Sequence, residues 1–218
     1  MNSNLKKFAR GKLPLLLLAV NTVISFVRHS QSRRKIKNIL SNRKTFFVEL
    51  GAGEKKGTGN WITLDMSTKC DVFWDLRNGI PFPDQSVSKL YSSHLFEHLT
   101  FKEGQLLLDE CIRVLAPGGT FSICVPNARL YIEAYLNPDT VDKNNFFDHR
   151  PAYNNTSKID AINYMAYMDG HHKYMFDEEN LVEILRLKRF NKVQLRKYDP
   201  NLDRLERDFE SIYAEAEK

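Results

Sequence analysis

The sequence predicts an α/β protein with a mostly parallel, seven-stranded sheet and helices on both faces. Three observations lead to this class. From residue 45 onward, short runs of β-forming residues alternate with loops and amphipathic helical stripes. The inner runs are apolar throughout, which is typical of parallel strands covered on both faces. The chain has 218 residues, 42% of them hydrophobic, which is enough for one domain with a buried core.

Each predicted element has a local signal. The strands are rich in β-forming residues, and the last two should form a hairpin that adds an antiparallel strand. The helices show apolar residues every three or four positions, the first ended by Pro117-Gly118-Gly119 and the second capped by Asp177. The expected strands are Thr45–Leu50, Ile62–Asp65, Asp71–Asp75, Val87–Tyr91, Thr120–Val125, Val193–Tyr198 and Ser211–Glu217, and the helices are Phe101–Leu115 and Glu178–Leu187.

Residues 1–44 form an N-terminal arm that differs in charge from residues 45–218. The arm holds eleven Lys or Arg and no Asp or Glu, which leaves 21 basic and 27 acidic residues in the body. A basic arm suggests an anionic partner, such as a membrane, a nucleic acid or an acidic protein surface. Its apolar run, Leu13–Val27, is shorter than the roughly 20 residues that cross a bilayer. Three interpretations stay open: a helix in a membrane interface, a helix packed on the domain, and an organelle transit peptide.

The three cysteines, Cys70, Cys111 and Cys124, are scattered and include no CxxC pair. Neither a disulfide framework nor a zinc ribbon is indicated, and no metal is expected. This usage favours a reducing compartment. We therefore expect a cytoplasmic protein with a peripheral membrane contact through residues 1–44.

Glycines and acids follow the first strands in an order that indicates a nucleoside site. Gly51 and Gly53 allow a tight turn where the backbone can approach a ligand closely. The third glycine of a dinucleotide motif is absent, because that position holds Lys56. Asp65 ends the second strand and can accept hydrogen bonds from both ribose hydroxyls, and Asp75 can accept one from an exocyclic amine. The set predicts a site for an adenosine without phosphates.

Several segments after the arm carry a family resemblance. They are Phe47–Gly53, Asp75-Leu76, Ile80–Asp84, Leu90–Leu99, Arg113–Gly119, and His172–Asp177 with Arg189-Phe190. The first segment resembles the first motif of the class I methyltransferases, which use S-adenosylmethionine (SAM) and have a Rossmann-like fold, and the others are similar to the methyltransferase type 11 group. The likeness covers roughly residues 45–218, although Ser88 replaces a frequent acid and Arg189 replaces a usual glycine.

This resemblance implies SAM as the cofactor and gives a role to each matched residue. The methionine part of SAM would face the first motif, the ribose and adenine would face the acids after strands two and three, and the sulfonium side would face the end of strand four. The cofactor-binding residues so implied are Glu49, Gly51, Gly53, Asp65, Met66, Asp75, Leu76, Ser93 and His94.

His98 and His172 are the candidate catalytic residues. A histidine can remove a proton from an acceptor near neutral pH, although each could equally be structural. His172 and its neighbour His171 adjoin residues 127–175, a segment rich in Tyr, Asn and His that we expect to form a lid over the acceptor.

The run His94-Leu-Phe-Glu-His98 also matches the inverted zinc-protease pattern HxxEH. If this run were helical, both imidazoles would share a face and could bind zinc, with Glu97 as the base. The sequence shows no third ligand, so a zinc hydrolase is the minor alternative.

The expected reaction is methyl transfer from SAM to a small-molecule or glycan acceptor, with a saccharide or envelope-glycan intermediate as the first candidate. The sulfonium is already activated, so the protein mainly has to position the acceptor. Two alternatives stay open: a non-catalytic module that kept the fold, and an RNA methyltransferase that uses the basic arm. A nucleic-acid partner is not expected, because the body is acidic and contains no known RNA-binding module.

Overall fold

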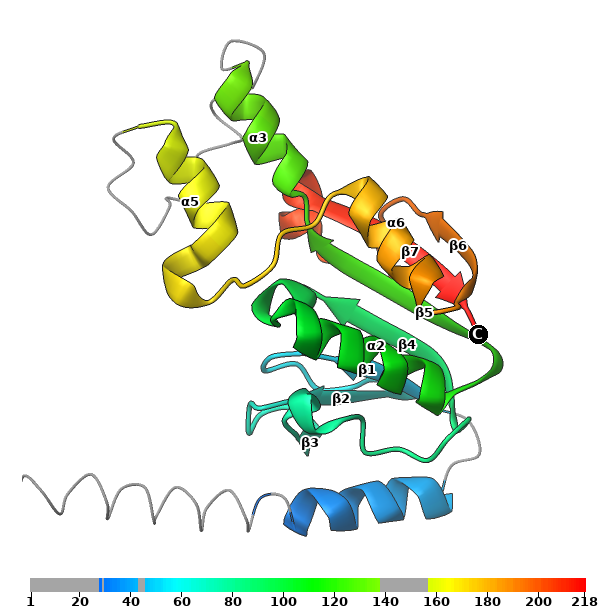
Figure 1. Cartoon of the computed structure of the whole chain (residues 1–218). Helices are drawn as coiled ribbons and strands as arrows, with labels where there is room; N and C mark the ends of the chain where they lie inside the picture. The colour runs from blue at the N-terminus through cyan, green and yellow to red at the C-terminus, as the bar shows by residue number, and fades with distance from the viewer. Residues whose placement is uncertain (1–27, 29, 43–45, 138–156) are drawn as a thin grey trace, which may run out of the picture.

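A seven-stranded sheet forms the centre of the computed structural model, which describes residues 28, 30–42, 46–137 and 157–218 (Figure 1). The strand order is β3-β2-β1-β4-β5-β7-β6, and only β7 runs against its neighbours. The predicted seven-stranded, mostly parallel α/β class is therefore confirmed. The strands are β1 (Phe47–Leu50), β2 (Trp61–Asp65), β3 (Val72–Phe73), β4 (Val87–Ser93), β5 (Leu115–Pro126), β6 (Asn191–Leu195) and β7 (Ser211–Glu217).

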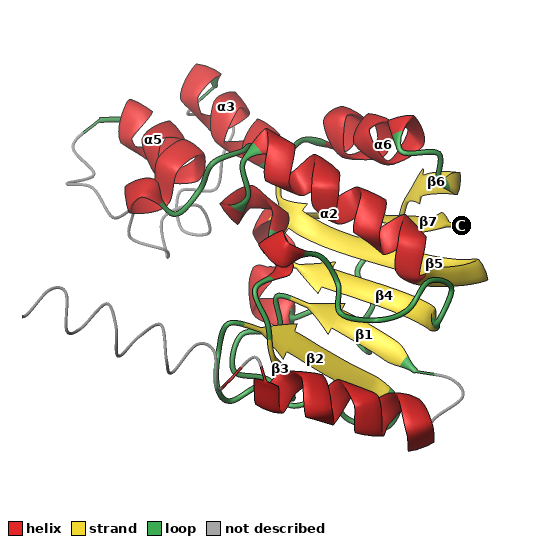
Figure 2. Cartoon of the chain, turned by 60° about the horizontal axis from the view of Figure 1, so that its bottom comes forward, coloured by secondary structure: helices red, strands yellow, loops and turns green. Residues whose placement is uncertain are grey.

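Two helices lie over one face of this sheet (Figure 2): α2 (Phe101–Val114) and α6 (Glu178–Leu187). Both begin at the predicted positions. Thr100 and Glu103 form a capping box at the start of α2, and the Asp177 side chain accepts a hydrogen bond from the Asn180 N–H at the start of α6. Their apolar stripes enter one core with the central strands.

Strands β3 and β5 differ in length from their predictions. β3 has two residues instead of five, because the Asp71 carboxylate binds the backbone of the preceding loop and Asp75 caps the short 3₁₀ turn η1 (Leu76–Asn78). β5 starts five residues early, at Leu115, because Pro117-Gly118-Gly119 continues the strand instead of separating it from the helix. The Gly118 N–H and Gly119 carbonyl hydrogen-bond with Lys218, at the end of the neighbouring strand.

The link between the parallel strands β1 and β2 has no helix. Residues 51–60 connect them as turns and loop, although parallel neighbours are usually joined by a helix. Side chains of the following strands hold this loop. The Asp65 carboxylate accepts from the Gly53 N–H at 2.9 Å, and the Asp71 carboxylate accepts from the Gly57 N–H at 2.9 Å. Thr63 donates its hydroxyl proton to the Lys55 carbonyl or to Asp71.

The second half of the arm, residues 30–42, is a helix packed on the sheet domain. The Ser32 hydroxyl donates to the Phe73 carbonyl at 2.8 Å, and the Lys35 ammonium donates to the Asp71 carbonyl at 3.1 Å. Ile36 is buried in the main core. The apolar run Leu13–Val27, on which the membrane-interface prediction rests, lies outside the described residues. Among those described, no helix is long and apolar enough to span a membrane.

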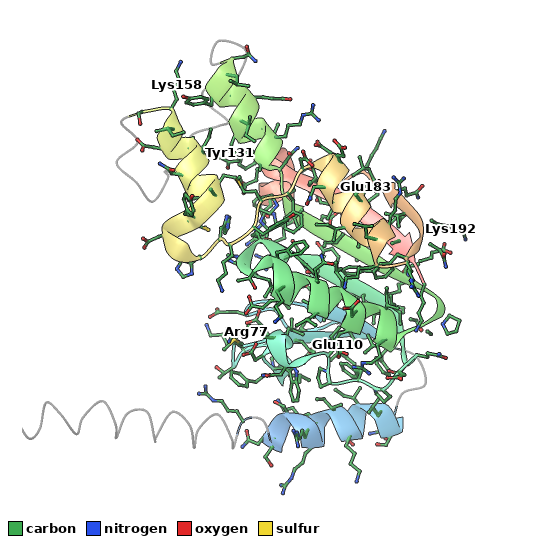
Figure 3. All side chains as sticks on the ribbon, in the orientation of Figure 1. Arg77, Glu110, Tyr131, Lys158, Glu183 and Lys192 are labelled. Atoms are coloured by element: carbon green, nitrogen blue, oxygen red, sulfur yellow. The ribbon has the colours of Figure 1, made fainter. Side chains whose placement is uncertain are left out.

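The predicted lid segment contains two helices, α3 (Ala128–Leu136) and α5 (Ile159–Tyr167), which pack side by side (Figure 1). Residues 138–156, between them, lie outside the described chain. Tyr131 of α3 (Figure 3) donates its hydroxyl proton to Glu210 at 2.8 Å, at the end of the 3₁₀ turn η4 (Leu205–Glu210). The pair forms a small core of its own, made of Ala128, Tyr131, Ala161 and Met165.

Candidate functional site

Two adjoining cavities open at the carboxyl ends of β1, β2 and β4, where the strand order reverses. Their volumes are about 730 and 270 Å³, and they share Gly51, Asp65, Leu95 and His98. All nine predicted cofactor residues line one or both. The larger is lined by Glu49, Gly51, Gly53, Asp65, Ser93 and His94, and the smaller by Gly51, Asp65, Met66, Asp75 and Leu76.

Gly51 makes the turn that opens the larger cavity. Its φ is 70°, a left-handed conformation that favours glycine, and a Cβ there would lie 2.9 Å from the Leu95 side chain. Gly53 is also left-handed, with φ 63°, but a Cβ there would meet nothing within 4 Å. Glycine is therefore favoured at position 51 by the left-handed backbone and by the close contact with Leu95, and at position 53 by the left-handed backbone alone.

Asp65 joins the glycine turn to the end of β2. One carboxylate oxygen accepts from the Gly53 N–H at 2.9 Å, and the other accepts from the Ser67 N–H at 2.8 Å. Because an ionised carboxylate has about four lone-pair directions, two remain for ligand hydroxyls. The position next to both cavities suits a ribose.

Asp75 is already held by a cation. Its carboxylate accepts from the backbone N–H and the guanidinium of Arg77, with a closest ion-pair distance of 2.7 Å. Arg77 is labelled in Figure 3. The hydrogen bonds to Asp75 raise the pKa of Arg77 above its ordinary value. The predicted contact from Asp75 to an adenine amine would have to compete with this ion pair.

Glu49 lies below the glycine turn as a nearly buried carboxylate, 2.8 Å from the Lys55 ammonium. Lys55 belongs to the loop after β1, so this ion pair fastens the loop to the floor of the cavity.

His94 and Glu97 lie at the end of β4 in a buried, polar corner. Burial, followed by the nearby Arg207 charge, lowers the pKa of His94 to about 3, and burial raises the pKa of Glu97 to about 8. His94 has φ 51°, and the 3₁₀ turn η2 (Phe96–His98) starts only two residues later. His94 and His98 therefore do not share one helix face, as the HxxEH interpretation required. The His94 Nε2 is instead 2.9 Å from the Ser211 hydroxyl.

His98 and His172 lie edge to face, with ring centroids 5.0 Å apart. His98 lines both cavities, and its Nδ1 donates to the His171 carbonyl at 3.0 Å. His172 is buried, and its Nδ1 donates to the Met165 carbonyl at 2.8 Å. Burial lowers the pKa of His172. The structure thus brings the two predicted catalytic residues together, with His98 on the cavity side, while their catalytic roles stay predictions.

Three further cavity residues were given no role from the sequence. Leu95 fills the space beside Gly51, and Arg204 and Arg207 reach the larger cavity from the segment that carries η4. Leu95 lies in the segment Leu90–Leu99 of the family resemblance, whereas Arg204 and Arg207 lie in no predicted element or motif. Arg77 is two residues after the predicted acid Asp75, so a charge-pairing argument could have found it, whereas Lys55 is six residues after its partner Glu49 and no local signal links the two.

Comparisons with known proteins agree with this fold. Residues 66–123 match a family model described as "Methyltransferase domain". A SAM-dependent methyltransferase from Archaeoglobus fulgidus has a similar structure, with TM-score 0.50, 15% identity, and coverage of 87% of this chain and 94% of that one. The chain has a SAM-dependent methyltransferase fold. Among curated proteins, no sequence matches significantly.

Two further structures share the methyltransferase fold at TM-score 0.50. One is a SAM-dependent methyltransferase from Mesorhizobium loti, with 17% identity over 79% of this chain and 90% of that one. The other is 1,6-didemethyltoxoflavin-N1-methyltransferase from Burkholderia thailandensis, with bound 1,6-didemethyltoxoflavin and S-adenosylhomocysteine, at 12% identity over 100% of this chain and 91% of that one. At such identities the likeness concerns the fold. The match to the methyltransferase model includes His98 and begins directly after Asp65.

Proposed function

We propose that the chain transfers a methyl group from SAM to a small-molecule or glycan acceptor. The observation that carries this proposal is the pair of adjoining cavities, which share Gly51 and Asp65. The left-handed turn at Gly51 and the Asp65 carboxylate lie side by side there, at the point where the strand order of the sheet reverses. Open parallel sheets bind nucleosides at such a point.

The residues present fit SAM in size and chemistry. The two cavities together lie in the range of about 300–1,000 Å³ found for small-molecule sites. Asp65 keeps two lone-pair directions for ribose hydroxyls, while Met66, Trp74 and Leu76 give the smaller cavity apolar walls for an adenine ring. The larger cavity, with Glu49 and the glycine turn, would hold the methionine part.

The protein's own contribution is to bind and to orient. When bound, SAM supplies a methyl group already activated on a sulfonium. The glycine turn and Asp65 would fix the nucleoside, and the end of β4 would place Ser93 and His94 against the reactive side. The His98 Nδ1 is committed to a carbonyl, so its Nε2 would be the atom that accepts a proton from the acceptor.

The test is SAM binding to the purified chain by calorimetry. We expect saturable binding, and Asp65→Ala should weaken it by about 1–2 kcal/mol, because a pair of hydrogen bonds to a charged group is lost. Asp109→Ala, on the exposed side of α2, serves as the control and should leave the dissociation constant unchanged. No heat with the wild-type chain, or equal affinities for the two variants, would count against the proposal.

For the acceptor we propose a hydroxylated compound, with a saccharide or envelope-glycan intermediate first. Arg204 and Arg207 line the larger cavity and suit an acceptor with an anionic group. A peripheral membrane contact through residues 1–44 would bring the site close to lipid-linked acceptors. A labelled-methyl assay with cell-extract fractions tests this. Label found only in RNA would favour the RNA methyltransferase, and SAM binding without any transfer would favour the non-catalytic module.

A further inference from the structure

Glu97, His98 and His172 form a cluster that the proposed methyl transfer does not by itself require. One potential ligand atom from each lies within 4.8 Å of the other two. Glu97 is 2% exposed, and within the described chain no other residue donates a hydrogen bond to either of its carboxylate oxygens. A buried polar group without a partner is costly, so this carboxylate points to a cationic partner.

The hydrogen bonds of the two histidines show which ring nitrogens carry the protons. The His171 carbonyl can only accept, so the His98 Nδ1 that binds it carries the proton and the Nε2 is left with a lone pair. The same holds for His172, whose Nδ1 donates to the Met165 carbonyl. The bare His98 Nε2 lies 3.9 Å from the Glu97 Oε1.

His94 adds a third lone pair to this corner. The Ser211 hydroxyl donates its only proton to the Arg207 carbonyl at 2.6 Å, so it must accept from the His94 Nε2. The His94 Nδ1 is therefore bare, and it lies 3.4 Å from the same Glu97 Oε1. The unprotonated His94 Nδ1 and His98 Nε2 thus both lie near the Glu97 Oε1, and all three atoms are hydrogen-bond acceptors. A proton on Glu97 could satisfy one of these pairs only, whereas a metal ion is shared by several lone pairs at once.

We propose that Glu97, His98 and His172 bind a divalent transition-metal ion at the wall of the larger cavity. Two imidazoles and one carboxylate are a ligand set used by zinc and by non-haem iron, and they leave coordination positions open. At metal–ligand distances near 2.1 Å, neighbouring ligands lie about 3.4 Å apart in a tetrahedral site. The 3.9 Å between the Glu97 Oε1 and the His98 Nε2, and the spread of up to 4.8 Å across the three ligand atoms, would have to contract to that value on metal binding.

The surroundings support such a site. The carbonyls of Met165 and His171 hold the two imidazoles by their other nitrogens, the outer contact that orients most histidine ligands. His98 also lines both cavities, which gives the ion access to a bound molecule. In one respect this inference rests on the proposed function. With the His98 Nε2 bound to the ion, that nitrogen would no longer serve as the base. The open coordination positions would instead bind an acceptor through an oxygen, such as a hydroxyl group, and would make its proton easier to remove.

The experiment uses the full chain after removal of metals with a chelator. Zn²⁺ is titrated by calorimetry, and Co²⁺ is added as a probe whose visible absorption reports the coordination. We expect saturable binding of one ion. Glu97→Gln and His98→Gln should each weaken it at least about 100-fold, because each removes a ligand. His171→Gln changes an exposed neighbouring imidazole outside the cluster and should bind like the wild type.

Two results would overturn the site: no saturable metal binding by the wild-type chain, or the same affinity in all three variants. His98 is partly exposed, so its variant is expected to fold even if Glu97→Gln does not; circular dichroism checks both. SAM binding is measured separately in the metal-free chain. Metal binding without SAM binding would support the metal site and contradict the proposed function. SAM binding without metal binding would support the proposed function and contradict the metal site.

Discussion

Gly51 and Leu95 show how one close contact can define a cavity. The left-handed turn sends the chain back over the end of β1, and the Leu95 side chain occupies the space where a Cβ would stand. Gly53 shares the backbone conformation but faces open space. The two glycines of the motif therefore differ in their tolerance to substitution, although the sequence alone makes them look equivalent.

We expect Gly51→Ala to weaken SAM binding at least about tenfold and to destabilise the fold by about 1–3 kcal/mol more than Gly53→Ala. Both variants have the cost of a left-handed alanine, but only the first overpacks against Leu95. Calorimetry and urea unfolding measure the two effects. The cost of Gly51→Ala should be smaller in a Leu95→Ala background, because two of the three leucine atoms that lie within 3.0 Å of the added Cβ, Cγ and Cδ1, are then absent. An equal cost in both backgrounds would contradict the explanation.

At the scale of elements, Arg113 at the end of α2 fixes the loop that leads into β4. Its guanidinium donates to the Glu110 and Asp84 carboxylates and to the Ile80 and Phe82 carbonyls, at 2.7–2.9 Å. The segments Ile80–Asp84 and Arg113–Gly119, both part of the family resemblance, thus meet in a single hydrogen-bonded cluster. Glu110, labelled in Figure 3, also accepts from the Ile80 N–H.

Arg113→Met should lower the free energy of unfolding by about 2–3 kcal/mol at neutral pH, because half-buried acceptors lose their donor. Arg186→Met is the matched control. It breaks an exposed ion pair with Glu183 on α6 and should cost less than about 1 kcal/mol. Urea unfolding measures both, and similar costs for the two variants would refute this view of the cluster.

The cost of Arg113→Met should also depend on pH. Hydrogen bonds from Arg113 lower the pKa of Glu110 below its ordinary value of 4.5. A carboxyl whose pKa is depressed in the folded state contributes stability above its unfolded pKa and loses it as the pH falls through the folded pKa. The difference between wild type and variant should therefore narrow below about pH 4.5. A constant difference down to pH 3 would show that the Glu110 charge plays no part.

At the scale of the whole molecule, the helix of residues 30–42 is part of the packed domain. It contributes Ile36 to the main core and binds the β3 end of the sheet through Ser32 and Lys35. Some of the basic charge of the arm is therefore displayed on the surface of the folded domain. Arg28 stands over the Phe73 ring at 5.3 Å, which extends this contact to the start of the described helix.

We expect Ile36→Ala to destabilise the protein in solution by about 2–4 kcal/mol, since a buried isoleucine is truncated. Lys37→Ala, on the exposed side of the same helix, should change the stability by less than about 0.5 kcal/mol. Thermal and urea unfolding in the absence of lipid measure both. If Ile36→Ala had no effect without lipid, packing on the domain would not be the main role of this helix.

An element or site residue could be predicted from the sequence where its signal lay within one short segment of the chain. β1, β2, β4 and β7 were predictable because continuous or alternating apolar runs reflect their burial in the sheet. α3 and α5 were not, because they pack mainly on each other and their apolar faces are short. The glycine and acid positions pointed to the cavity, since they follow strands that end at one edge. The place of Arg207 at the cavity and the lack of another described residue that donates to the Glu97 carboxylate could not be predicted, because both result from chain segments far apart in the sequence.

The loop between β1 and β2 carries one more consequence. Since Asp65, Thr63 and Asp71 already hold its backbone, a ligand arriving at this wall would meet a surface whose shape is set beforehand. Little chain entropy would then be lost on association, and the affinity would reflect the contacts themselves. Removing any of these hydrogen bonds should weaken ligand binding mainly because the loop of the ligand-free protein would then sample more conformations, even where the residue does not contact the ligand.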